Sequence, residues 1–170
     1  MTDITIRHIH EADNSALAVI IRKTLEEFGA NLPGTVYYDA TTDHLSDVFT
    51  VPGSVYFVAE KDGEVLGGGG IYPTAGLPAD TCELVKLYLS PTARGLGLGK
   101  KLMAHCLQAA ATHGFTKVYL ETMPELTNAI PLYKKFGFKN LDAPMGNTGH
   151  HGCAVWMLND AVVDVDGGGF

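Results

Sequence analysis

The feature that most constrains this chain is a glycine-rich turn that joins a strand-like segment to an amphipathic helix, within residues 87–103. The strand-like segment ends at Pro91, and Gly95, Gly97 and Gly99 alternate through the turn. Glycines allow the backbone to curl there, so that several N–H groups converge without interference from Cβ atoms. The unpaired N–H groups of the first helical turn add partial positive charge. The turn therefore predicts a binding site for a phosphate or diphosphate group.

The glycine spacing excludes two common nucleotide-binding loops. A P-loop requires G-x-x-x-x-G-K-[ST], but Arg94 stands at the first glycine position and Lys101 at the Ser/Thr position. The dinucleotide fingerprint G-x-G-x-x-G also fails, because the glycines fall at alternate positions. We expect Arg94 and Lys100 to supply positive charge on either side of the anion. The alternative is a glycine-rich entry to a core helix that binds nothing.

The remaining pattern predicts an α/β fold that contains antiparallel hairpins. Asp62-Gly63 separates two strand-like runs and is a strong hairpin signal. Four consecutive glycines at 67–70 indicate a bulge or a closely passing backbone. This order of elements favours a mixed sheet covered by helices over a doubly wound Rossmann sheet. Strands are expected at residues 4–9, 55–60, 64–72, 81–90, 116–121 and 154–158, and helices at 17–28, 42–49, 97–113 and 127–136.

Length predicts a single domain, and the net charge limits the kinds of ligand that the chain binds. We assign residues 1–160 of the 170 to a single domain and residues 161–170, which end in GGGF, to a poorly ordered tail. The formal net charge of −7 argues against nucleic-acid binding. It favours a cationic ligand such as an amine, although solubility alone also explains an acidic surface.

The chain also lacks signals for membrane insertion or export. No apolar run approaches the ~18 residues that a membrane span requires, and the first residues lack the basic and apolar regions of a secretory signal. Cys82, Cys106 and Cys153 are odd in number and far apart. This number and spacing fit reduced thiols better than a set of disulfides, so we expect a cytoplasmic protein.

Two motifs resemble those of the GNAT N-acetyltransferase superfamily. Residues 94–99, RGLGLG, are similar to its R/Q-x-x-G-x-G/A signature, which also follows a strand that ends in proline. Residues 132–138, LYKKFGF, are similar to its L-Y-x-x-x-G-F segment, and one strand separates the two motifs as in the superfamily. The resemblance covers nearly the whole chain. It implies the GNAT fold, an α/β (α+β) domain with a mixed sheet of about seven strands flanked by about four helices.

The resemblance also implies a cofactor and a reaction. An acetyl-CoA-dependent N-acetyltransferase transfers the acetyl group to a primary amine of a small molecule or peptide by direct attack in a ternary complex, with no metal. A non-catalytic acyl-CoA-binding or regulatory module on the same fold is the alternative. Many relatives are dimers, which makes a homodimer an open expectation. The implied cofactor-binding residues are Leu87, Tyr88, Leu89, Arg94, Gly95, Leu96, Gly97, Gly99, Lys100 and Tyr133.

Catalytic residues carry over from the same resemblance. Glu83 lies where several members have a glutamate general base. A base is needed because an ammonium group must lose its proton before its nitrogen attacks. The alternatives for Glu83 are an exposed strand-edge charge or a partner for Lys86. Tyr133 is implied as the general acid beside the coenzyme sulfur, although its ring also suits a core position. A backbone N–H near Leu87 or Tyr88 would stabilise the oxyanion.

The acceptor end is the least defined part of the sequence. Many members have Asn where this chain has Leu126, and we expect the nearby Asn128 to cap the following helix. His150 and His151 precede Cys153 but lack the spacing of a zinc site. We expect either solvated loop histidines or one histidine facing the acceptor. Acceptor contacts in the superfamily often come from the first two helices and their connection, so the candidates for acceptor contacts are Tyr38, Asp39 and His150, with Glu26, Glu27 and Tyr37 nearby.

Overall fold

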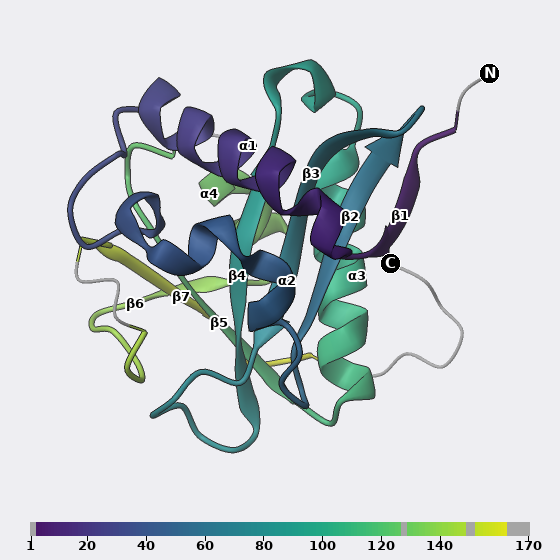
Figure 1. The fold of residues 1–170 in the computed structure, drawn as a ribbon. Helices are drawn as coiled ribbons and strands as arrows, with labels where there is room; N and C mark the ends of the chain where they lie inside the picture. The colour runs from purple at the N-terminus through teal and green to yellow at the C-terminus, as the bar shows by residue number, and fades with distance from the viewer. Residues whose placement is uncertain (1–2, 127–128, 149–151, 163–170) are drawn as a thin grey trace.

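A seven-stranded mixed sheet forms the centre of the computed structural model, which describes residues 3–126, 129–148 and 152–162 (Figure 1). The strand order is β1-β2-β3-β4-β5-β7-β6, with β4 and β5 parallel and the other neighbouring pairs antiparallel. The strands are β1 (Thr5–His8), β2 (Val55–Lys61), β3 (Glu64–Tyr72), β4 (Thr81–Leu89), β5 (Lys117–Thr122), β6 (Lys139–Leu141) and β7 (Val155–Asn159).

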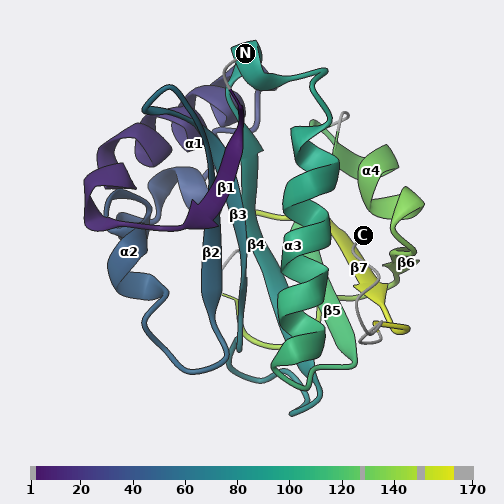
Figure 2. The ribbon, with the colours of Figure 1, turned by 90° about the vertical axis from the view of Figure 1, so that its right-hand side faces the viewer.

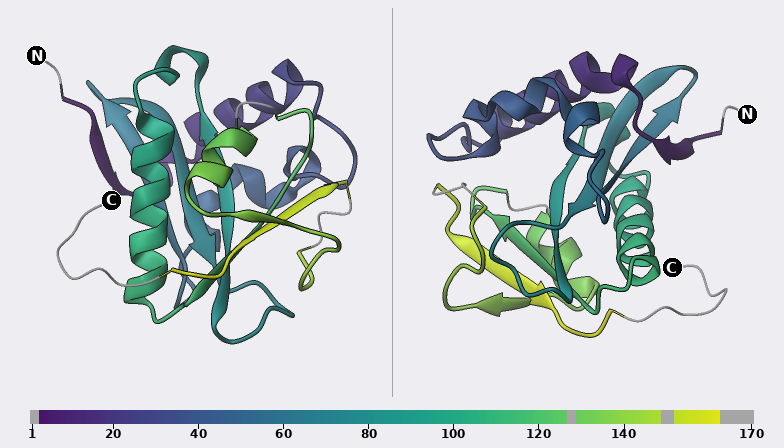
Figure 3. Two further views of the ribbon diagram at one scale, coloured as in Figure 1. Left: turned by 180° about the vertical axis from the view of Figure 1, so that it is seen from behind. Right: turned by 60° about the horizontal axis from the view of Figure 1, so that its bottom comes forward.

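Four α-helices in the described residues cover the two faces of this sheet, which confirms the predicted mixed architecture. They are α1 (Asn14–Glu27), α2 (Leu45–Val48), α3 (Leu98–Thr112) and α4 (Ala129–Lys135). Figure 2 shows α1 and α2 on one face, and the left panel of Figure 3 shows α3 and α4 together on the other. None of the helices in the described residues is long and apolar enough to cross a membrane.

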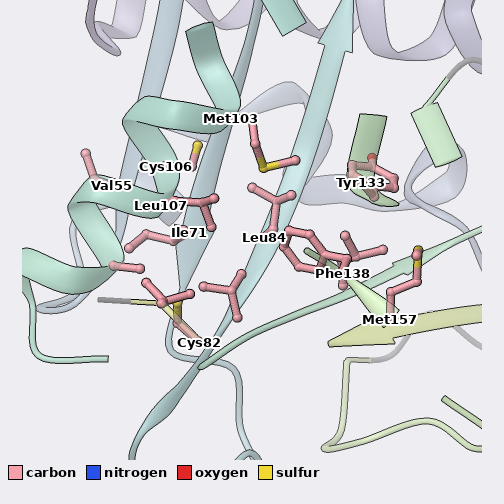
Figure 4. Packing of buried hydrophobic residues seen from close by; sticks show 14 residues of the cluster. Val55, Ile71, Cys82, Leu84, Met103, Cys106, Leu107, Tyr133, Phe138 and Met157 are labelled. Carbon is pink, nitrogen blue, oxygen red and sulfur yellow. The ribbon is translucent and has the colours of Figure 1, made fainter. Parts of the chain in front are cut away.

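Apolar side chains on alternate strand positions fill both faces. Leu17, Ile21 and Leu25 of α1 pack on one face, where they cover Tyr56 and Val58 of β2. The larger cluster under α3 and α4 contains Met103, Cys106, Tyr133 and Phe138 against the strand residues (Figure 4). The fold thus has a buried cluster on each face of the sheet, and β4 contributes to both, through Cys82 and Leu84 on the α3 side and Tyr88 on the α1 side.

The predicted hairpin is confirmed between β2 and β3. Asp62 and Gly63 have φ values of 53° and 78°, and Lys61 pairs with Glu64. A two-residue turn with positive φ at both central residues matches the right-handed twist of the flanking strands. The hairpin places the glycine run of β3 beside β4.

The glycine run coincides with the predicted bulge. Gly68 pairs with Tyr88 and Gly70 with Val85, so β4 has one residue more than β3 over this interval. The extra residue falls at Lys86, whose φ is 53°. Such a bulge disrupts the ladder locally and turns backbone groups away from the neighbouring strand.

Other predictions need correction. The sequence analysis missed β6, a three-residue edge strand. It also predicted one helix at 42–49, whereas the structure has a 3-10 turn, Ala40–Asp43, and then α2. His44, with φ −134° and ψ 44°, breaks the helical backbone between them. Beyond β7, Val162 is buried and its N–H donates to the Thr116 carbonyl.

Candidate active site

A cavity of about 490 Å³ opens where β4 and β5 separate. The two strands pair only over Thr81–Glu83 and Lys117–Tyr119. In Figure 4 they diverge beyond Cys82, and Leu84, Tyr133 and Phe138 lie in the angle between them. Both strands, the glycine-rich turn, α4 and the end of α1 line the cavity. A gap between two central strands exposes backbone groups that a sheet would otherwise pair, so it suits a ligand that contains amides.

The glycine-rich turn forms one end of this cavity. After β4 a 3-10 turn, Pro91–Ala93, leads to Gly95 and Gly97, whose φ values are 80° and 75°. A Cβ added to either glycine would meet nothing within 4 Å, so these glycines serve the left-handed backbone rather than close packing. Gly97 is the N-cap of α3, and Gly97 through Lys100 line the cavity. The first turn of a helix with free N–H groups therefore faces the space where we predicted a diphosphate.

Arg94 is held by α1 rather than left free for an anion. Its Nη1 donates to Glu27 Oε1 at 2.7 Å, and its guanidinium carbon lies 5.4 Å from the centre of the Phe28 ring. The hydrogen bond from Arg94 lowers the pKa of Glu27. Lys100 is exposed at the cavity edge. The predicted positive charges are thus present, but a carboxylate already partners one of them.

Glu83 lies buried at the point where the strands part. Its side chain is on the central strand β4, with 4% of its surface exposed, so its interpretation as an exposed strand-edge charge was wrong. Thr74 Oγ1 donates to Glu83 Oε1 at 2.7 Å. Burial raises the pKa of Glu83 to about 7, the Thr74 hydrogen bond opposes this, and the charge of Glu121 adds to it. The charge of Lys86 attracts the Glu83 carboxylate. The ion pairs of the described residues, with nitrogen–oxygen distances of up to 4.0 Å, do not include these two residues.

Tyr133 reaches the same cavity from α4. Its ring belongs to the larger core and stands edge-on to Phe138, with ring centres 6.1 Å apart. Tyr133 is 7% exposed and lines the cavity. It is therefore both a core residue and a residue of the candidate site. Burial raises the pKa of its phenol, which keeps the proton on the hydroxyl at neutral pH.

A hydrogen-bonded group that the sequence analysis missed surrounds Glu121 of β5. Tyr119 Oη donates to Glu121 Oε2 at 2.7 Å and accepts from the Met145 N–H at 3.0 Å, and the Thr148 hydroxyl donates to Glu121 Oε1. The charge of Glu121 opposes ionisation of Glu83 and so raises the pKa of Glu83. No local motif marks this group, because the loop between β6 and β7 supplies Met145 and Thr148 to the two β5 residues.

The other predicted residues fall in different places. Leu87, Tyr88, Leu89 and Gly99 line the cavity, whereas Leu96 is 51% exposed and is absent from the lining. Tyr38 is 64% exposed and also lies outside the lining. Asp39 accepts hydrogen bonds from Thr41 and attracts the Lys86 ammonium. His150, His151 and Asn128 are outside the described residues.

Two further features concern metal binding and thiols. Within the described residues, no group of three His, Cys, Asp or Glu side chains is arranged to hold a metal ion. Cys153 lines the cavity, and burial raises the pKa of its thiol to about 12. A protonated thiol is a poor nucleophile, so the surroundings of Cys153 do not activate its sulfur.

Comparisons with known proteins agree with this geometry. Residues 20–138 match the family described as Acetyltransferase (GNAT) family. The chain is 42% identical over 156 residues to the uncharacterized N-acetyltransferase YjgM of Escherichia coli K12, covering 91% of this chain and 93% of the relative. The chain belongs to the GNAT family and is an acyltransferase of that family.

Solved structures share the fold at low sequence identity. A GNAT acetyltransferase of Staphylococcus aureus Mu50 superposes with a TM-score of 0.82 at 17% identity, covering 93% of this chain and 99% of that one. The yncA protein of Salmonella typhimurium, solved with its cofactor acetyl-CoA, gives a TM-score of 0.69 at 20% identity, covering 92% of each chain. These likenesses confirm the predicted GNAT fold.

Proposed function

We propose that the chain transfers an acetyl group from acetyl-CoA to a primary amine of a small molecule or peptide by direct attack in a ternary complex. One observation carries the proposal: a single cavity joins the anion-binding turn at one end to the buried carboxyl of Glu83 and the phenol of Tyr133 at the other. These are the groups that acyl transfer to an amine needs, namely a carrier site, a base and an acid.

The residues present fit the coenzyme. The first turn of α3 offers N–H groups and partial positive charge for the diphosphate, with Arg94 and Lys100 beside it. The diverging edge of β4, at Leu87 through Leu89, offers backbone groups for the amide-containing pantetheine arm. When bound, the coenzyme supplies an acyl group on a good thiolate leaving group.

Glu83 prepares the amine. An aliphatic ammonium has a pKa near 10, so it requires a proton acceptor before its nitrogen attacks. With a pKa of about 7, Glu83 is half ionised at neutral pH and is a stronger base than an ordinary carboxylate. It takes the proton from the attacking nitrogen directly or through water. Glu121 keeps this base strength high, since its charge raises the pKa of Glu83.

Tyr133 and the bulge act at the other reacting atoms. As the carbon–nitrogen bond forms and the carbon–sulfur bond breaks, negative charge develops first on the carbonyl oxygen and then on sulfur. The backbone N–H of Leu87 or Tyr88, freed at the bulge around Lys86, donates to that oxygen. Tyr133 donates its proton to the departing sulfur and regains one from the acylated nitrogen or through water, and Glu83 later releases to solvent the proton that it accepted.

A screen of amines tests the proposal. The protein is incubated with acetyl-CoA and a panel of amino acids, polyamines and short peptides, and free thiol release is measured together with the mass of the acetylated product. We expect release that depends on one class of amine. If acetyl-CoA binds tightly but no amine of any class is acetylated, the chain is instead a binding module. If acetyl-CoA does not bind at millimolar concentration in calorimetry, the proposed carrier site is wrong.

The thiols are consistent with a reducing compartment. The three cysteines are unpaired, and Cys82 and Cys106 are buried in the core. We therefore propose that the enzyme works in the cytoplasm, where such thiols stay reduced.

A further inference from the structure

Thr122 has a buried hydroxyl without a partner in the cavity. It is the last residue of β5, 4% of its surface is exposed, and it lines the cavity. Among the described residues its Oγ1 is the one buried side-chain oxygen or nitrogen that lacks a hydrogen-bond partner. Buried hydroxyls are nearly always paired, because an unpaired one loses its bonds to water and gains nothing in return. An unpaired hydroxyl in a ligand cavity therefore indicates where a ligand completes the bond.

The backbone of Thr122 fixes this side chain in place. Thr122 pairs with Val155 of β7, and its carbonyl accepts a hydrogen bond from the Ala154 N–H at 3.2 Å. Alternation along β5 puts Thr122 on the same face as Val118 and Leu120. Both of those residues pack in the core cluster that contains Tyr133. The hydroxyl thus lies on the α4 face of the sheet, the face that also carries the proposed acid.

Glu83 lies on the opposite face of the sheet. Its neighbours along β4, Cys82 and Leu84, belong to the core cluster under α3 and α4, so alternation turns the Glu83 side chain to the face covered by α1. The proposed base acts on the amine. Thr122, on the other face, is therefore placed to meet the carrier and its acyl group rather than the attacking nitrogen.

The strand register places Thr122 level with the bulge. Glu83 and Tyr119 are the last paired residues of β4 and β5. Thr122 lies three residues beyond Tyr119, and Lys86 of the bulge lies three residues beyond Glu83. Because the strands are parallel, the two positions face each other across the widening gap. The amides of Leu87 and Tyr88, which we assign to the carbonyl oxygen, come directly after Lys86.

We infer that the Thr122 hydroxyl donates a hydrogen bond to the carbonyl oxygen of the bound acyl thioester. This inference rests on the proposed function. The oxygen then receives one donor from the amides of β4 and a second from the side chain at the end of β5. Both donors stabilise the charge that develops there, and the acyl group is held between the strands with its carbon open to the amine.

Two variants separate the hydroxyl from the shape of the side chain. Thr122→Val keeps the branched shape and removes the hydroxyl, whereas Thr122→Ser keeps the hydroxyl. Because the hydroxyl has no partner in the free protein, we expect Thr122→Val to melt at the wild-type temperature or above. A lower melting temperature for the Val variant would show that the hydroxyl serves the fold, and would overturn the inference.

Binding and turnover then locate the contact. We expect Thr122→Val to weaken acetyl-CoA about threefold to tenfold while CoA, which lacks the carbonyl, binds as in the wild type. Turnover should fall at least ~10-fold, as for the loss of an oxyanion donor, and Thr122→Ser should restore most of it. In infrared difference spectra with carbonyl-¹³C acetyl-CoA, the thioester stretch should move to higher frequency in the Val variant.

Three results would contradict this assignment. Equal weakening of acetyl-CoA and CoA would put the contact on the pantetheine arm, an unchanged carbonyl stretch would remove it from the acyl group, and unchanged turnover would remove it from the transition state. Failure of the wild-type protein to bind acetyl-CoA would instead count against the proposed function.

Discussion

The Thr74 hydrogen bond lowers the pKa of Glu83 against the effects of burial and of Glu121, so Thr74→Val is a direct test of the role of Glu83. Thr74 Oγ1 donates to Glu83 Oε1 at 2.7 Å and so favours the ionised carboxylate. The Val variant removes this donor without adding charge. The pKa of Glu83, already about 7 because of burial, should therefore rise further.

The size of the effect follows from the energy of that bond. A hydrogen bond to a charged group contributes about 1.5–3 kcal/mol, and part of it persists with the protonated carboxyl, so a net change of about 1.4 kcal/mol, or one pH unit, is expected. At pH 6.5 the ionised fraction of Glu83 then falls about eightfold, whereas at pH 9 the two proteins differ little. The loss is thus confined to the acidic limb.

The assay is the pH profile of kcat/KM between pH 5.5 and 9.5, which reports ionisations of the free enzyme and free amine. The amine contributes equally to both proteins, so the difference between their acidic limbs belongs to the enzyme. Thr74→Ser retains the hydroxyl and should follow the wild-type curve. If the Val variant is folded and its acidic limb coincides with that of the wild type, Glu83 is not the group that sets the limb.

Three further substitutions test other parts of the site. Tyr133→Phe removes the proposed acid, so turnover should fall by about 10²-fold, with CoA affinity in calorimetry unchanged; wild-type turnover would exclude the acid role. Gly97→Val puts a branched residue at φ 75°, which should lower the free energy of unfolding by about 1–2 kcal/mol in urea titrations and weaken CoA more than about 10-fold; tight CoA binding would mean that the diphosphate lies elsewhere. Glu27→Gln releases Arg94, so CoA should bind about two- to threefold more tightly at low salt and less so at high salt; weaker binding would show that Glu27 orients Arg94 for the anion.

The local parts of the fold were predictable because their signals are local. Asp62-Gly63 encodes a turn through two positive φ values, and the alternating glycines after Pro91 encode the approach to α3. The edge strand β6 was missed because three residues are too short for a period to show. The split of the second helix was missed because His44 has no sequence signal as a helix breaker.

The chemistry of the site was predictable only in part. Resemblance pointed to Glu83 and Tyr133, and the structure brings both to one cavity. The residues that tune Glu83 were not found, because Thr74 lies in the loop before β4 and Glu121 lies on β5. Thr74 and Glu121 each act on Glu83 from a different segment of the chain, and no sequence motif links these segments to β4. The same holds for the Arg94–Glu27 pair, whose members are 67 residues apart.

The glycine run of β3 lacks side chains, and this determines the backbone geometry of the neighbouring strand β4. A Cβ at Gly68 would come within 2.5 Å of the Tyr56 ring, and a Cβ at Gly70 within 2.7 Å, so the glycines of β3 leave room for this ring. The Tyr56 hydroxyl then donates at 2.8 Å to the carbonyl of Lys86, the residue in the bulge. Tyr56 of β2 therefore holds the bulge of β4 through this hydrogen bond. Its ring reaches β4 over the glycines of β3, which have no side chains to block it. Four glycines predict that a backbone is distorted nearby, and the packed sheet shows the distortion on both sides of them, at Leu66 within β3 and at Lys86 in β4.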